Sequence, residues 1–68
     1  MQIVDARGLG CPEPALMAAE AFDEFPNEPV QVLVSWATAK VNVSELAERK
    51  GRKVTVERDG DDYVITAE

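Results

Sequence analysis

The chain has 68 residues and a net charge of -6, and it contains one cysteine and no histidine. A chain of this length forms one domain that buries only about 60% of its unfolded surface, so its core must be small. It has neither the roughly 18 apolar residues of a membrane span nor the start of a signal peptide, which predicts a soluble, cytoplasmic protein without membrane insertion. A single cysteine excludes a disulfide within the chain. Because there is also no histidine, we expect no metal site, and we expect no other cofactor.

The negative charge is concentrated in the first half of the chain. Residues 1–36 carry six carboxylates and one cation, Arg7, whereas residues 37–68 carry seven carboxylates and six cations. Because an acidic surface repels phosphates, we expect no direct nucleic acid binding. The charge suits a basic protein partner, and a second interpretation is that it only keeps a small domain in solution.

The first half predicts a strand, a glycine loop and a helix. The β-branched pair in Gln2–Ala6 predicts a strand, which ends at a loop that contains Gly8 and Gly10. A helix is expected from Pro12, at the first helical position, to Phe25. Its expected apolar positions are Ala15, Ala18, Phe22 and Phe25, with Leu16 and Ala19 beside them and Glu13, Glu20 and Glu24 on the opposite face.

The middle of the chain predicts a strand and a second helix. Val30–Trp36 is the strongest strand pattern, and we expect it to lie in the centre of the sheet. Asn42 is the expected N-cap of the next helix, with Glu45 completing a capping box and Gly51 ending the helix. The expected hydrophobic staple is Val41 to Leu46, and the expected inward positions are Val43, Leu46, Ala47 and the aliphatic part of Lys50.

The last third predicts an antiparallel hairpin. Two alternating segments, Lys53–Arg58 and Tyr63–Ala67, are joined through residues 59–62, which read Asp-Gly-Asp-Asp. The element order is therefore βαβαββ. We expect one domain, residues 1–68, with an α/β (α+β) two-layer sandwich in which two helices cover one face of a four-stranded mixed sheet.

Cys11 is the candidate functional residue, because the pattern places it as N-cap of the first helix. There the helix dipole and the N–H groups of Glu13 and Ala15 would favour the thiolate, while Pro14 removes one donor. Arg7 either lowers the thiol pKa or pairs with Asp5 or Glu13, and the pattern leaves both open. Cys11 could also be a small buried hydrophobe.

The chemistry open to Cys11 is limited by what the chain lacks. Without histidine there is no general base for a cysteine hydrolase, which leaves disulfide exchange or the carriage of a group such as sulfane sulfur. Trp36, at the end of the central strand, is expected to be a core or edge-covering aromatic, with partner docking as the second interpretation.

The stretch Asp5–Pro14 resembles the signature of the TusA/SirA-like sulfur-carrier family, which has a Cys-Pro-x-Pro motif. The matching positions are Asp5, Gly8, Leu9, Cys11, Pro12 and Pro14. Residues 38–51 are similar in particular to the YedF branch, which is associated with selenium metabolism. The chain departs from the family at residues 35–37, where acidic residues are usual, and at Val41 and Asn42, where tRNA-thiolation members have an arginine-aspartate pair.

The resemblance implies that Cys11 is the catalytic residue and carries sulfur as a persulfide. Arg7, Gly8, Leu9, Pro12, Glu13 and Pro14 would form the supporting motif. The implied partners are a protein sulfur donor, either a cysteine desulfurase or a rhodanese, and a protein sulfur acceptor in a relay. Two alternatives stay open. One is an interaction or regulatory module, including a selenium-metabolism or transporter-associated role, in which Cys11 is structural. The other is a redox sensor that forms a Cys11–Cys11 disulfide between chains.

Overall fold

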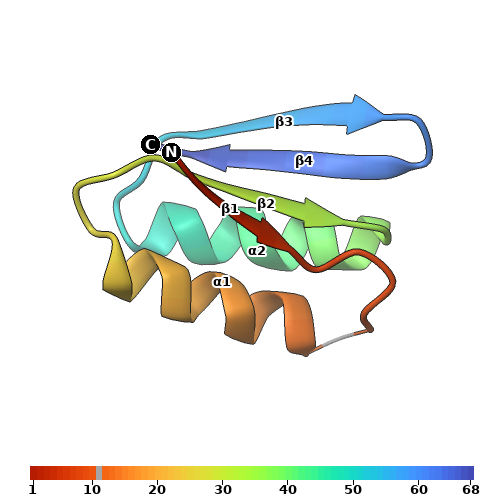
Figure 1. Ribbon diagram of the computed structural model, residues 1–68, viewed down its shortest axis with the longest axis horizontal. Helices are drawn as coiled ribbons and strands as arrows, with labels where there is room; N and C mark the ends of the chain where they lie inside the picture. The colour runs from red at the N-terminus through yellow and green to blue at the C-terminus, as the bar shows by residue number, and fades with distance from the viewer. Residues whose placement is uncertain (11) are drawn as a thin grey trace.

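The computed structural model describes residues 1–10 and 12–68 and shows a two-layer sandwich. The elements are β1 (Gln2–Asp5), α1 (Glu13–Glu24), β2 (Val30–Val34), α2 (Ala37–Arg49), β3 (Val54–Asp59) and β4 (Asp62–Ala67). Both helices lie on the same face of the sheet (Figure 1). The predicted element order and architecture are therefore confirmed.

The sheet has the strand order β1-β2-β4-β3. β1 pairs with β2 in parallel, and the other two pairs are antiparallel, so the sheet is mixed. β2 lies between β1 and β4, as its hydrophobicity predicted, and β1 and β3 are the edge strands. The β3–β4 turn has a positive φ at Gly60, as a two-residue hairpin with glycine at its first position requires.

The core lies between β2, β4 and the two helices. Every second residue of β2 is fully buried, and so is Ile65 on β4, which is paired with Val32. Small residues dominate the helix faces, which lets both helices approach the sheet closely. The buried core residues are Ala6, Ala18, Ala21, Phe22, Val30, Val32, Val34, Ala39, Val43, Ala47, Ile65 and Ala67.

α1 begins one residue later than predicted, because Pro12 is its N-cap and Glu13 its first residue. Its buried side chains are Pro14, Ala18, Ala21 and Phe22, so the inward stripe is rotated from the predicted one. Leu16, expected beside the stripe, is 54% exposed. This helix has more apolar side chains than positions that face the sheet, and alanine occurs on several of its faces. The sequence alone therefore does not show which face is buried.

The prediction for the start of α2 is wrong. The helix begins at Ala37 with Trp36 as its N-cap, so Asn42 and Glu45 lie on an exposed face inside the helix and form no capping box. Burial explains the earlier start, because Ala39 precedes Val43 by four residues and extends the same inward stripe. Lys50 does not pack inward; its ammonium pairs with Asp23 at 2.8 Å.

The end of α2 confirms the predicted role of Gly51. Its N–H donates to the carbonyl of Glu48 at 2.9 Å, and the N–H of Arg52 donates to the carbonyl of Ala47 at 3.0 Å. With the φ of +79° at Gly51, these bonds make a Schellman motif. The motif fixes the backbone position of the next residue, Arg52.

Arg52 links three parts of the chain, which the charge pattern did not predict. Its guanidinium donates to the carbonyls of Phe22 and Phe25 at the end of α1, at 3.1 and 2.5 Å. It also donates to the carbonyls of Glu28 and Ala67, at 3.0 and 3.4 Å. The same group lies 4.9 Å from the centroid of the Phe22 ring. Arg52 therefore caps α1 rather than the helix that precedes it.

The two chain ends lie together at one end of the molecule (Figure 1). The amino group of Met1 pairs with Glu28 at 3.3 Å, and the N–H of Glu68 donates to the carbonyl of Lys53 at 2.9 Å. The starts of both helices lie at the opposite end (Figure 1). Within the described part of the chain, no helix has the length and apolar character that crossing a membrane requires.

Candidate functional site

The candidate site lies where the carboxyl ends of β1 and β2 meet the starts of α1 and α2 (Figure 1). The predicted motif, residues 5–14, runs through this end. Cys11 was predicted to be the N-cap of α1, but the N-cap is Pro12. Cys11 itself lies outside the described residues. The neighbours of Cys11 in the chain, Gly10 and Pro12, are both exposed.

The loop of residues 6–10 is attached to the carboxyl end of β2. The N–H of Ala6 donates to the carbonyl of Leu33 at 2.8 Å, and the N–H of Gly8 donates to Oγ of Ser35 at 2.8 Å. Gly8 has a φ of +80°, a conformation that glycine adopts without strain. Ser35 is thus a supporting residue that no local sequence pattern indicates, since its partner is 27 residues away.

Replacing Gly8 by alanine is expected to lower the free energy of unfolding by about 1 kcal/mol, because a side chain strains the left-handed backbone. Apart from its chain neighbours, no described atom lies within 4 Å of the added Cβ, so we expect the effect to come from the backbone conformation. Gly10→Ala is the matched control, since Gly10 has no positive φ and, apart from its chain neighbours, no described atom lies within 4 Å of the added Cβ. Urea titrations of both variants measure the difference; equal stabilities would contradict the prediction.

Arg7 pairs with Asp5 rather than with Glu13. Its Nε and Nη2 donate to the two carboxylate oxygens at 2.9 and 2.8 Å, and its backbone N–H donates to Oδ1 at 3.2 Å. These bonds lower the pKa of Asp5 from 3.8 to about 2. The pairing with Asp5, and secondarily the charges of Asp62 and Asp59, raise the pKa of Arg7. The structure thus shows the expected pairing of Arg7, while its effect on the pKa of the Cys11 thiol stays a prediction.

The Asp5 pKa gives a pH-dependent test of this pair. The folded pKa is below the unfolded one, so the contribution of the pair to stability is complete above about pH 4 and is lost as the pH falls towards 2. We expect Arg7→Gln to return the pKa of Asp5 towards 3.8, measured by NMR titration of its side-chain carboxyl carbon. Arg49→Gln, on α2, is the control and should leave that pKa unchanged.

The start of α1 has fewer available N–H groups than predicted. The N–H of Glu13 donates to the carbonyl of Gly10 at 3.1 Å, and Pro14 has no N–H. Pro14 is buried, while Pro12 and Glu13 are exposed. The N–H of Glu13 is therefore not free, contrary to expectation, while its place relative to the sulfur of Cys11 lies outside the described residues. The two prolines instead fix the direction in which the chain enters the helix.

Trp36 is exposed, so the prediction of a core or edge-covering aromatic is wrong. As N-cap of α2 it lies beyond the last residue of β2, and 51% of its surface is accessible. Next to it in the chain, the first turns of α2 line an open depression of about 560 Å³, formed by Ala37, Thr38, Val41 and Asn42. Val41 is 48% exposed rather than part of a staple.

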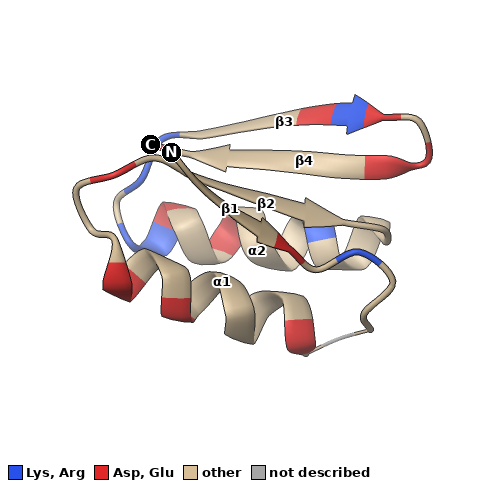
Figure 2. Ribbon diagram, viewed as in Figure 1, with Lys and Arg blue, Asp and Glu red and all other residues tan. Residues whose placement is uncertain are grey.

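Both signs of charge occur at this end of the molecule. The β3–β4 hairpin carries Asp59, Asp61 and Asp62 at its tip (Figure 2). Two cations lie near them: Lys40 and Arg58 are 5.0 and 4.9 Å from the centroid of the Tyr63 ring. The most strongly basic segment, residues 49–53, lies at the other end (Figure 2). Among residues 1–10 and 12–68, no group of three metal-ligating side chains comes together.

Comparison with known proteins agrees with this fold. A family model described as sulfurtransferase TusA matches residues 2–68. The crystal structure of a SirA-like protein from Desulfitobacterium hafniense superposes with a TM-score of 0.90 at 30% sequence identity, covering 98% of this chain and 95% of that one. No curated protein sequence matches the chain.

Proposed function

Because the chain belongs to the TusA sulfurtransferase family, we propose that it is a sulfur carrier that holds sulfane sulfur as a persulfide on Cys11. The observation that carries this proposal is the family match over residues 2–68, a span that includes the only thiol of the chain. The exposure of Gly10 and Pro12, on either side of Cys11, supports access by a second protein.

The proposed transfer is a thiol-disulfide type exchange. The Cys11 thiolate attacks the terminal sulfur of a persulfide on the donor, a cysteine desulfurase or a rhodanese. The donor sulfur–sulfur bond breaks, the donor cysteine leaves as a thiolate, and the new sulfur–sulfur bond forms on Cys11. An acceptor thiolate then attacks the terminal sulfur in the same way and releases the Cys11 thiolate. No electrons are gained or lost overall, so no redox cofactor is needed.

The described residues around Cys11 would position it rather than take part in proton transfer. Gly8 and Leu9 belong to the loop attached to Ser35, and Pro12 and Pro14 fix the start of α1. Arg7 is held by Asp5, and Glu13 is exposed. The positive end of α1 would stabilise the charge of a terminal persulfide. Such an arrangement suits a group that must be accepted and then released.

Intact-mass measurement tests the proposal directly. After incubation with a cysteine desulfurase and cysteine, the protein should gain the mass of one sulfur atom, and a reducing agent should remove it. The Cys11→Ser variant should gain nothing, while Asn27→Cys in the Cys11→Ser background controls for loading of any exposed thiol, because Asn27 is exposed and lies outside the candidate site. A wild-type protein that gains no sulfur, or a Cys11→Ser protein that gains as much, would contradict a carrier role.

The same samples distinguish the alternatives. An interaction or regulatory module with a structural Cys11 would give no sulfur gain and slow reaction of the thiol with an alkylating reagent. A redox sensor would give a covalent dimer on a non-reducing gel after oxidant treatment. The YedF likeness adds a separate question, which loading with a selenium donor in place of a sulfur donor would answer.

A further inference from the structure

β1 has an open edge. The N–H of Gln2 donates to the carbonyl of Pro29 at 3.0 Å, and that of Ala6 to the carbonyl of Leu33 at 2.8 Å. The backbone groups of a strand point alternately to its two sides, so the even-numbered residues of β1 bond to β2. The N–H and C=O groups of Ile3 and Asp5 therefore point away from the sheet, where β1 has no neighbouring strand.

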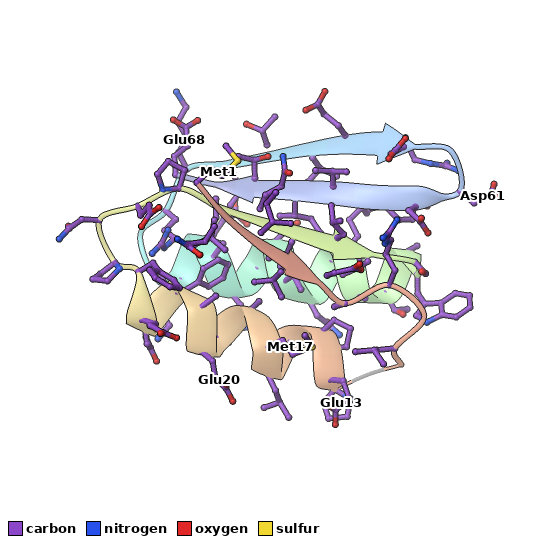
Figure 3. All side chains as sticks on the ribbon, viewed as in Figure 1. Met1, Glu13, Met17, Glu20, Asp61 and Glu68 are labelled. Carbon is purple, nitrogen blue, oxygen red and sulfur yellow. The ribbon has the colours of Figure 1, made fainter. Side chains whose placement is uncertain are left out.

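A groove of about 330 Å³ runs beside this edge, between β1 and α1. One wall is the whole of β1. The other is a single face of α1, formed at helical spacing by Met17, Glu20, Ala21, Glu24 and Phe25. Figure 3 labels Met17 and Glu20 on α1, the element that lies below β1 in that view. We call this site the β1–α1 groove.

The β1–α1 groove combines apolar surface with unneutralised negative charge. Met17 and Phe25 are half-buried, whereas Glu20 and Glu24 are exposed and make no ion pair with a described residue. α1 carries four carboxylates and no Lys or Arg (Figure 2). On the other side of β1, the Ile3 side chain is 63% exposed.

We propose that the β1–α1 groove binds an extended basic segment of a partner protein, which adds to the sheet as a fifth strand next to β1. Its backbone bonds to the outward groups of Ile3 and Asp5. Alternate side chains enter the groove, where Lys or Arg stems pack on Met17 and Ala21 while the cations reach the Glu20 and Glu24 carboxylates. The intervening residues lie beside Ile3, which favours β-branched side chains there.

Charge argues for a basic partner rather than for a second copy of this chain. Two copies joined through their β1 edges would bring the Glu20 and Glu24 carboxylates of both α1 helices to one interface, with no cation on either helix to offset them. A basic strand meets the same carboxylates with opposite charge. The proposal is independent of the chemistry of Cys11, since it rests only on β1 and residues 17–25, and none of the described residues 6–10 and 12 lines the groove.

The test uses a fluorescein-labelled peptide of sequence Lys-Val-Lys-Val-Lys-Val-Lys and fluorescence anisotropy at low salt. We expect it to bind at least tenfold more tightly than the matched Glu-Val-Glu-Val-Glu-Val-Glu peptide. In an amide NMR spectrum, the shifts should be largest for β1 and for residues 17–25. Equal binding of the two peptides, or shifts centred on the hairpin carboxylates at residues 59–62, would overturn the proposal.

Variants separate strand addition from simple charge attraction. Ile3→Pro removes an outward N–H without touching the bonds to β2, and should weaken binding about tenfold relative to Ile3→Ala, its matched control. The double variant Glu20→Gln and Glu24→Gln should also weaken binding and remove most of its salt dependence. Circular dichroism confirms that each variant is folded. Unchanged peptide binding by Ile3→Pro would overturn the strand-addition model. A dimer in solution that Ile3→Pro dissociates would also overturn the proposal, because the β1 edge would then bind a second copy of the chain.

Discussion

Arg52→Ala is expected to lower the free energy of unfolding by about 3 kcal/mol, although Arg52 belongs to a cluster of cations and is only partly buried. The guanidinium donates to four carbonyls, from the end of α1, the segment before β2 and the end of β4. Alanine leaves these carbonyls without their donor and removes the contact with the Phe22 ring. Urea denaturation followed by circular dichroism measures the change.

Two further variants show whether geometry or charge is responsible. Arg52→Lys keeps the charge but loses the planar fork, so it should recover less than half of the lost stability. Lys53→Ala removes a neighbouring exposed cation and should change stability by less than about 0.5 kcal/mol. If Arg52→Lys were as stable as wild type, charge near the end of α1 would be sufficient and the four-carbonyl explanation would be wrong.

Ile65→Ala is expected to cost about 3 kcal/mol, since it leaves a cavity in a core made largely of valine and alanine. Ile65 has no exposed surface and is paired with Val32 on one side and Val56 on the other. A domain of this size has a total stability of roughly 3–10 kcal/mol. The variant should therefore melt well below wild type or be unfolded at room temperature.

The control is the same substitution, isoleucine to alanine, at an exposed position, and thermal melting compares the two variants. Ile3→Ala removes the same atoms from a side chain that is 63% exposed, and should leave the melting temperature within a few degrees of wild type. A small effect at Ile65 would mean that the neighbouring helices close over the cavity. Equal effects at the two positions would contradict the packing described here.

The elements were predictable because the strands alternate cleanly and the turns have glycine. Val30–Trp36 predicted the central strand, Gly51 the end of α2, and residues 59–62 the hairpin, and the structure confirms all three elements. Two bounds differ, because β2 ends at Val34 and Asp59 pairs with Asp62, which leaves only residues 60 and 61 in the turn. The start of α2 was mispredicted because Val41, Asn42 and Glu45 have the residue types and spacing of a helix start, although they lie inside the helix. Only the burial of Ala39 against the sheet shows that the helix begins earlier.

The supporting contacts of the candidate site were less predictable than its motif. The pairing of Arg7 with Asp5 was one of two open choices, because it depends on how the loop turns rather than on spacing. The bond from Gly8 to Ser35 joins residues from two strands and has no local signature. The exposure of Trp36 follows from β2 ending at Val34, two residues before the predicted end. The predictions for Cys11 itself stay predictions.

The placement of the two chain ends has a practical consequence for measurement. Met1 and Glu68 lie together, away from the loop of residues 6–10 and the helix starts (Figure 1). An affinity tag, a fluorescent reporter or a surface tether attached at either terminus would leave that loop facing solution. A short linker could also join the two ends, so that a circularly permuted chain opened at the β3–β4 hairpin tip should fold to the same sandwich.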